Sequence, residues 1–287
     1  MEVKLVPRHI STEKEKEIVE YYKSKPMTLN ELVSKFGLCS PSIGKILNKY
    51  HIARYTKSQL YSPELVEDYF SVINTQEKAY FLGLIITDGC IYSKNGKSPR
   101  ISLSLHDNDS YLIKMFLKEI HSNKKVTNDG RGCSEVAIGS HKMVSDLRKY
   151  GLLERKSLCT IFPSNLPIDY YPSLLRGIID GDGSISFYAR KGRKCHTKAI
   201  RLCSGNEKFL LDIVEFLHRV VGIDPVNVYR DKENLWSIAY RKTASLLKLI
   251  EYLYSDAEIY MKRKKELCDL VYAECVQYTD GNTEITK

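Results

Sequence analysis

The chain repeats its own pattern of helices and strands, and this internal repeat constrains the fold more than any other feature of the sequence. Each copy predicts an apolar helix, two strands with alternating apolar and polar residues, an amphipathic helix, a second strand pair and another amphipathic helix. The copies cover residues 75–170 and 171–275. We therefore expect an α+β fold of two pseudo-symmetric half-domains facing each other across an approximate twofold axis.

Each copy opens with an apolar helix that carries a glycine near its middle. These helices are expected at residues 75–88 and about 172–182, with Gly83 in the first and Gly177 in the second. Glycine inside a helix costs about 1 kcal/mol relative to alanine, so a compensating role is expected. Close approach of the two helix backbones would supply it, and we expect the two helices to pack on each other.

An aspartate stands in the last turn of each of these helices. Gly89 and Gly183 follow it, where we expect the left-handed conformation that ends a helix. The negative end of the helix dipole disfavours Asp88 and Asp182, so helix stability does not explain them. If the helices pack side by side, the carboxylates meet, and a divalent cation between them would remove their repulsion. Each Asp-Gly pair alone could be a simple turn, but the doubled placement favours a Mg²⁺ site.

These residues resemble the motifs of the LAGLIDADG homing endonucleases, in their single-chain form with two motifs. Residues 81–89 (FLGLIITDG) correspond to the first motif and residues 175–183 (LRGIIDGDG) to the second. The resemblance covers roughly residues 75–275 and includes the βαββα order of each half. It implies a monomer whose two curved antiparallel sheets form a DNA-binding saddle, with the motif helices at its centre.

The resemblance also implies a chemistry. Such an enzyme would be a magnesium-dependent endodeoxyribonuclease that hydrolyses phosphodiester bonds of double-stranded DNA by in-line attack of a metal-activated water and leaves staggered ends with short 3′ overhangs. Asp88 and Asp182 would be the catalytic acids, holding two or three Mg²⁺ ions at the half-domain interface. The backbone of Gly89 and Gly183 would complete the ligand set. The target would be long and asymmetric, because the two halves differ.

Two lysines fall where a lysine assists catalysis in such enzymes. They are Lys156 and Lys264, and Lys264 is the better match to the pattern. Asp180 occupies the sixth position of the second motif, where the first motif has Ile86. We therefore expect Asp180 to have at most a secondary role.

Residues 1–60 predict three short helices, the third opening with Ser40 as its N-cap before Pro41. The second and third helices resemble a helix-turn-helix, in which the second helix lies in the major groove of DNA. The side chains expected to contact DNA there are Ser40, Ser42, Lys45 and Lys49. A three-helix packing unit with no role in DNA binding is the alternative. Residues 61–74 are expected to be a linker.

The charge balance favours an anionic partner. The chain has 44 Lys and Arg residues against 35 Asp and Glu residues, a formal net charge of +9. A basic run alone could be a solvated loop, but on the strands of a DNA-binding saddle it would contact bases or phosphates. The candidates are Lys94, Lys97, Arg100, Arg190, Lys191, Arg193, Lys194, Lys198, Arg201, Arg230, Lys232 and Arg241. Tyr92, Tyr188 and Tyr229 are expected to be packing residues instead.

The hydropathy and the cysteine spacing restrict which class of protein this chain can be. No stretch approaches the roughly 18 apolar residues of a membrane span, and the N-terminus has no apolar secretory signal. We expect a soluble intracellular protein of the cytoplasm, the nucleoid or an organelle matrix. The eight cysteines have no metal-binding spacing, which predicts buried reduced thiols. Residues 276–287 are polar and are expected to be disordered.

Two other functions remain compatible with the sequence. A transcription regulator could bind DNA on the same scaffold without cleaving it, although it would have no chemical need for both acids. An RNA maturase for the host intron is the second alternative. A helix-turn-helix favours duplex DNA over RNA, because the deep, narrow major groove of RNA would not admit its second helix.

Overall fold

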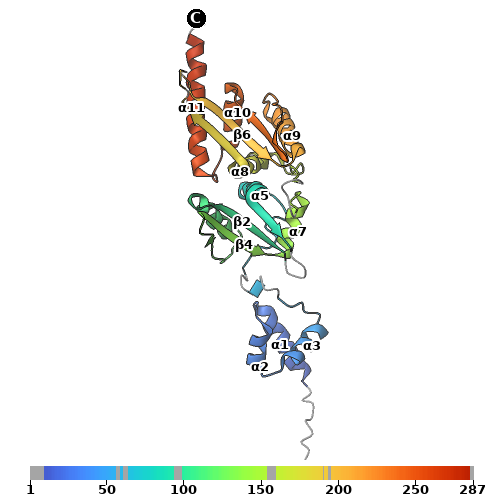
Figure 1. Cartoon of the computed structure of the whole chain (residues 1–287). Helices are drawn as coiled ribbons and strands as arrows, with labels where there is room; N and C mark the ends of the chain where they lie inside the picture. Colours follow the sequence, from blue (N-terminus) through green and yellow to red (C-terminus); the bar gives the residue numbers. More distant parts are fainter. Residues whose placement is uncertain are drawn as a thin grey trace, which may run out of the picture. The chain divides into compact units, whose positions relative to one another are not determined.

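The structure is a computed structural model, and it describes residues 10–55, 59–60, 64–93, 99–153, 160–189, 191–192 and 195–284. The chain divides into two compact units (Figure 1). The smaller unit comprises Met1–Val66 with His121–Asn123, and the larger comprises Glu67–Ile120 with Lys124–Lys287.

Among the described residues, the smaller unit includes three short helices. They are α1 (Thr12–Ser24), α2 (Leu29–Phe36) and α3 (Ser40–Lys49). Their apolar faces meet in a core that includes Ile18, Tyr22, Leu32, Ile43 and Leu47, each no more than 2% exposed. The N-cap of α3 is Cys39, so the prediction of Ser40 is wrong by one residue. Pro41 fits the first turn of the helix, where its missing N–H group is not needed.

The larger unit holds the two copies of the repeat. The first half contains α5 (Gln76–Asp88), β1 (Gly89–Tyr92), β2 (Arg100–His106), the 3₁₀ turn η1 (Asp107–Asp109), α6 (Ser110–Glu119), β3 (Thr127–Asn128), β4 (Cys133–Gly139) and α7 (His141–Lys149). The second half contains the 3₁₀ turn η3 (Ile168–Tyr170), α8 (Tyr171–Asp182), β5 (Gly183–Tyr188), β6 (Thr197–Ser204), α9 (Glu207–Phe216), the π-helical turn η4 (Leu217–Val221), β7 (Tyr229–Lys232), β8 (Leu235–Tyr240) and α10 (Thr243–Tyr254). A further helix, α11 (Lys262–Glu284), follows.

Each half forms one antiparallel sheet of four strands. The strand orders are β1-β2-β4-β3 and β5-β6-β8-β7, so the two sheets have the same topology. Because the two halves also share their order of helices and strands, the predicted pseudo-symmetric α+β architecture is confirmed.

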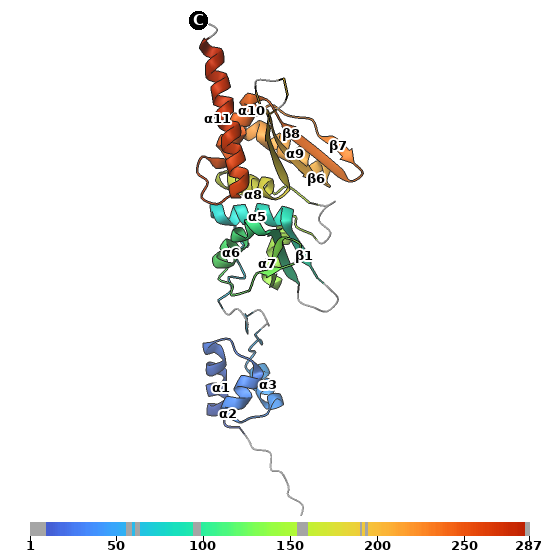
Figure 2. The ribbon, with the colours of Figure 1, turned by 60° about the vertical axis from the view of Figure 1, so that its left-hand side comes forward.

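Helices cover one face of each sheet, as Figures 1 and 2 show. Alternate strand residues point to these helices, since side chains on a strand alternate between its two faces. In β2 the buried set includes Ile101 and Leu103, and in β6 it includes Ile200 and Leu202. The opposite face of each sheet carries the other alternating set, which is mostly small or polar.

The first half-domain begins earlier in the chain than predicted. Tyr69, Phe70 and Ile73 are buried, and the ring centroids of Tyr69 and Phe70 both lie 6.2 Å from that of Phe116. The hydroxyl of Ser71 donates to the carboxylate of Asp146 on α7 at 2.6 Å. These contacts make residues 67–74 part of the half-domain core, so the expected linker over residues 61–74 was too long.

The C-terminal segment is helical, contrary to the disorder expected from residue 276. Helix α11 continues to Glu284. Cys268, Val271 and Cys275 are fully buried at helical spacing, which explains why this helix packs on the half-domain. The expectation of buried thiols holds for these two cysteines and is wrong for Cys39, Cys90 and Cys195, which are exposed.

A membrane-spanning helix is also absent from the part of the chain that the structure describes, where every helix is too short or too polar to cross a bilayer.

Candidate active site at the paired motif helices

The two motif helices, α5 and α8, touch through their backbones (Figure 1). A Cβ atom added to Gly83 would lie 2.2 Å from the carbonyl oxygen of Leu174. A Cβ atom added to Gly177 would lie 2.2 Å from the carbonyl oxygen of Tyr80. Only glycine permits this approach. Close packing of the two helices therefore offsets the cost of a glycine inside each helix, as the sequence analysis predicted.

Gly89 and Gly183 do not adopt the expected left-handed conformation. Their φ angles are −82° and −81°, and both residues are extended and begin the first strand of their half. The reason for glycine here is steric. An added Cβ would lie 2.5 Å from the Ile85 carbonyl oxygen at Gly89, and 2.4 Å from the Ile179 carbonyl oxygen at Gly183. Glycine therefore lets each strand start directly from the last helical turn.

The acids of the two motifs lie at the same end of the helix pair. Asp88 is half-buried and Asp182 is exposed, each as the last residue of its helix. The Oδ2 atom of Asp88 is 3.2 Å from the position that a Cβ on Gly181 would take. The carboxylate of Asp88 therefore lies against Gly181 in the last turn of α8, one residue before Asp182.

The chemistry of this pair of acids fits a hard divalent cation. Mg²⁺ is commonly held by one or two carboxylates together with water and substrate phosphates. Within the described ranges no three His, Cys, Asp or Glu side chains gather in a metal-binding cluster.

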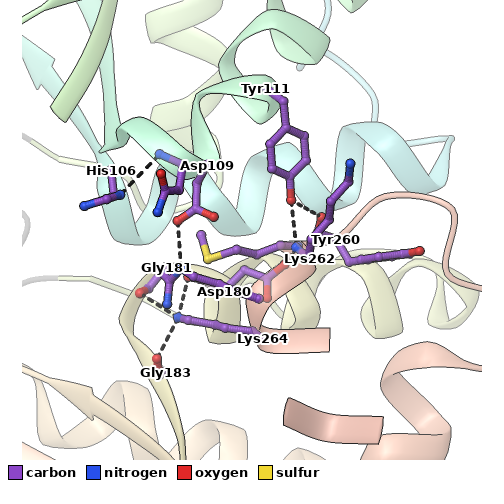
Figure 3. Close-up of polar contacts among 12 residues, drawn as sticks. His106, Asp109, Tyr111, Asp180, Gly181, Gly183, Tyr260, Lys262 and Lys264 are labelled. Carbon is purple, nitrogen blue, oxygen red and sulfur yellow. Dashed lines mark hydrogen bonds and ion pairs between the residues drawn. The ribbon is translucent and has the colours of Figure 1, made fainter. Parts of the chain in front are cut away.

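Lys264 lies buried beside this site, 4% exposed (Figure 3). Its Nζ donates to the carbonyl oxygens of Ile179 at 2.8 Å, Asp180 at 2.5 Å and Gly183 at 2.6 Å, and lies 3.2 Å from that of Gly181. Burial lowers the pKa of Lys264.

The ammonium group of Lys264 offsets the negative end of the α8 dipole and fixes the backbone on both sides of Asp182. Because its three N–H groups are engaged by carbonyls, Lys264 is placed to hold the site together rather than to contact a substrate. The Gly183 carbonyl, which the sequence analysis expected to contribute to a metal site, accepts a hydrogen bond from Lys264.

Asp180 has a larger role than the sequence suggested. It is fully buried, and its Oδ2 accepts from the Tyr80 hydroxyl at 2.8 Å and from the Met261 backbone N–H at 2.7 Å. It thereby joins α5, α8 and the segment that leads into α11. Burial raises the pKa of Asp180 to about 6, against the hydrogen bonds that stabilise its charged form.

Arg176 is a second buried charge that the sequence interpretation missed. It is 2% exposed, and its guanidinium donates to the carbonyls of Ile259, at 2.8 Å from Nε, and of Leu253. Arg176 and Asp180 are four residues apart within the apolar stretch of this helix, a spacing that places both on one helix face. That spacing was visible in the sequence, and the first motif has Leu82 and Ile86 instead.

Two residues of the first half hold the start of α11. The Tyr111 hydroxyl donates to the Tyr260 carbonyl at 2.9 Å and accepts from the Lys262 backbone N–H at 2.7 Å (Figure 3). The carboxylate of Asp109 accepts from Nε of Arg263 at 2.9 Å. These residues had no distinguishing pattern in the sequence, because their partners are about 150 positions away.

The open face of the first sheet carries an arginine on an aromatic ring. Arg100 pairs with Tyr92 across β1 and β2, and its guanidinium lies 4.7 Å from the ring centroid. Tyr92, Tyr188 and Tyr229 are 41%, 56% and 57% exposed, so the expectation that they are packing residues is wrong. Each lies on the strand face opposite the helices, where the alternation of its strand places it.

The basic residues of the second sheet divide between its two faces. Lys198 shares the helix-side face with Ile200, its side chain is 9% exposed, and its Nζ lies 3.1 Å from Glu274 of α11. Lys198 therefore forms a structural ion pair, and the prediction that it contacts DNA is wrong. Arg201 points to the opposite face, where its guanidinium pairs with Asp231 and donates to Ser237 at 3.2 Å.

The remaining predicted DNA contacts are exposed or fall outside the described residues. The exposed set comprises Lys191, Arg230, Lys232 and Arg241, with Arg230 lying 5.7 Å from the ring of Trp236. Lys94, Lys97, Lys156, Arg190, Arg193 and Lys194 lie outside the described residues.

The candidate contacts of the small unit also differ from one another. Ser40 and Lys45 are exposed on α3, whereas Ser42 is half-buried. Lys49 is directed to α1, where its Nζ lies 2.5 Å from Glu15. Lys45 is therefore the basic side chain of α3 that is better placed for a ligand.

The fold is similar to that of several solved nucleases bound to DNA. The match to the I-SmaMI structure bound to an uncleaved DNA target with calcium ions has a TM-score of 0.53 and 13% identity, and covers 72% of this chain and 93% of that chain. The I-SmaMI structure bound to cleaved DNA gives a TM-score of 0.52 and 13% identity, over 74% of this chain and 92% of that chain. The I-AabMI meganuclease bound to uncleaved DNA gives 0.51 and 12%, over 70% and 91%.

No protein-family model and no curated protein sequence matches the chain. On the strength of these structural matches, the chain has the fold of the LAGLIDADG homing endonucleases.

Proposed function

We propose that this chain is a site-specific endonuclease that hydrolyses phosphodiester bonds of double-stranded DNA with Mg²⁺ and leaves staggered ends. One observation carries the proposal: helix packing brings Asp88 and Asp182, one acid from each half, to the same end of the α5–α8 pair. A fold that only bound DNA would have no need for two acids at the unfavourable end of their helices.

The residues of the paired motif helices would have separate roles in metal binding and in positioning. Asp88 and Asp182 would hold the metal ions, with phosphate oxygens of the DNA taking the open positions. Bound Mg²⁺ would activate the attacking water and stabilise charge on the leaving oxygen. Lys264 and Asp180 would keep the end of α8 fixed, so that Asp182 needs no rearrangement when DNA binds.

The two open sheet faces would contact the DNA on either side of this centre. Arg100, with Tyr92, belongs to the first face and Arg201 to the second. Because the two faces carry different side chains, the target would be asymmetric, and one chain would bind it as a monomer. The similarity of the fold to nucleases solved in complex with DNA supports this arrangement.

The small unit would add a second contact to DNA. In this proposal α3 is the recognition helix of a helix-turn-helix, with Ser40 and Lys45 exposed for base or phosphate contacts. Cleavage would remain the property of the larger unit, because both acids are located there.

Incubation of the purified full-length protein with a library of random duplex DNA tests the proposal. Cuts should appear in Mg²⁺ at a recurring sequence, whereas in Ca²⁺ the same sequence should be bound and left intact. Specific binding without cleavage in any divalent metal would favour the non-cleaving regulator. Binding to intron RNA without binding to duplex DNA would favour the maturase.

A further inference from the structure

Four consecutive basic residues, Lys262, Arg263, Lys264 and Lys265, open helix α11, and its first turn has no acidic residue. The positive end of a helix dipole disfavours cations, so helix stability does not explain this run. The Nζ of Lys262 lies 5.0 Å from the ring centroid of Tyr111. Two others have partners within the second half-domain. Lys264 is buried among backbone carbonyls, and Lys265 pairs with Asp269 at 2.5 Å on the same helix.

Arg263 is different, because an acid from the other half-domain holds it in place. The Arg263 side chain is 53% exposed, whereas the Asp109 side chain that accepts from its Nε at 2.9 Å is 3% exposed. In the described part of the chain, Asp109 is the one hydrogen-bond partner of this guanidinium. A guanidinium has five N–H donors, so the pair fixes the side chain while leaving donors for a ligand.

The residues on either side of Arg263 fix the start of α11 against both half-domains. The ammonium of Lys264, the next residue, is bonded to the Gly183 carbonyl and lies 3.2 Å from the Gly181 carbonyl, on either side of Asp182 (Figure 3). On the other side of Arg263, the backbone N–H of Lys262 donates to Tyr111. The start of α11 is thus tied to the first half through Asp109 and Tyr111, and to the last turn of α8 through Lys264.

We propose that Arg263 contacts a backbone phosphate of the DNA beside Asp182, and that Asp109 is the positioning residue that holds Arg263 for this contact. The inference rests on the proposed function, since it names a substrate contact of the same site. A guanidinium binds phosphate through paired, charge-assisted hydrogen bonds, and holding it in advance reduces the entropy lost on binding. Because Asp109 and Arg263 belong to different halves, the contact exists only where the two halves are assembled.

The salt dependence of DNA binding tests the contact. The affinity for random duplex DNA would be measured in Ca²⁺ at several salt concentrations for the wild type, Arg263→Gln and Arg263→Lys. Loss of one phosphate contact should reduce the slope of log K against log salt by about 1 in Arg263→Gln, and Arg263→Lys should keep the slope. Arg219→Gln is the matched control, since Arg219 is exposed and pairs with Glu215 of α9.

A double-variant cycle tests the positioning role of Asp109. Asp109→Asn should lower the rate of DNA cleavage in the wild-type background and have no further effect in the Arg263→Gln background. A merely structural role would give the same loss in both backgrounds and would overturn the assignment of Asp109. An unchanged salt slope in Arg263→Gln would overturn the phosphate contact. In contrast, a wild-type protein that neither binds nor cuts duplex DNA would contradict the proposed function itself.

Discussion

The backbone of Gly83 on α5 lies directly against the carbonyl group of Leu174 on α8, where an added Cβ would approach the oxygen to 2.2 Å. Gly177 makes the equivalent contact with the backbone of Tyr80. This close contact determines where the two helices end relative to each other. It therefore also determines the spacing of the acids that follow.

Gly83→Ala should destabilise the larger unit. The new methyl group meets main-chain atoms that cannot rotate away, so the free energy of unfolding should fall by about 3 kcal/mol in urea denaturation. Gly139→Ala is the matched control, because a Cβ there has no atom within 4 Å. Equal stability of the two variants would contradict the backbone contact.

The two faces of the second sheet predict opposite effects for two nearby cations. Arg201→Gln should weaken binding to duplex DNA and reduce its salt slope by about 1, because Arg201 lies on the open face and its guanidinium keeps N–H donors beyond those that bond Asp231 and Ser237. Lys198→Gln should leave DNA affinity unchanged and lower stability by about 1 kcal/mol, because Lys198 pairs with Glu274 beneath the sheet. Binding assays and urea denaturation separate the two. Weakened DNA binding in Lys198→Gln would be inconsistent with this assignment.

Asp146 predicts a pH dependence of stability. Burial disfavours its charge, but hydrogen bonds from Lys142, Lys149 and Ser71 prevail and hold the pKa of Asp146 below its ordinary value of 3.8. A depressed pKa contributes stability above 3.8 that is lost as the pH falls through the folded-state pKa. Asp146→Asn should lower the free energy of unfolding by about 2 kcal/mol near neutral pH. The difference from the wild type should shrink below about pH 4, and a constant difference would argue against this role.

Helix α3 predicts different roles for its two lysines. Lys45→Gln should weaken DNA binding by the full-length protein, because Lys45 is exposed. Lys49→Gln should have a smaller effect, because its ammonium is already paired with Glu15. Cleavage at saturating protein should persist in both variants. Equal DNA affinity of the wild type and Lys45→Gln would leave the helix-turn-helix assignment without support.

The internal repeat made the architecture predictable, and the details that failed share a physical cause. Gly89 and Gly183 were expected to adopt positive φ because that is the common use of glycine after a helix. Instead, the requirement is steric and arises from a strand that begins within the last helical turn. Only the tertiary path of the chain shows which of the two requirements applies.

The charged residues of the site were predictable where a periodicity applied to them. Lys198 alternates with Ile200 and Leu202, so strand alternation alone would have placed it on the buried face. Arg176 and Asp180 were likewise detectable by helical spacing. In contrast, the partners of Lys264 lie more than 80 positions away, and no local pattern predicts that its ammonium is buried.

Substitution of the paired acids tests the central claim most directly. Once a cleaved sequence has been identified, Asp88→Asn and Asp182→Asn should each reduce its cleavage in Mg²⁺ at least about 100-fold, because each carboxylate contributes to the same metal site. Both variants should still bind that DNA in Ca²⁺. Their thermal stability should match that of the wild type, which shows that they are folded. Cleavage at the wild-type rate by either variant would contradict the assignment of Asp88 and Asp182 as a shared catalytic centre.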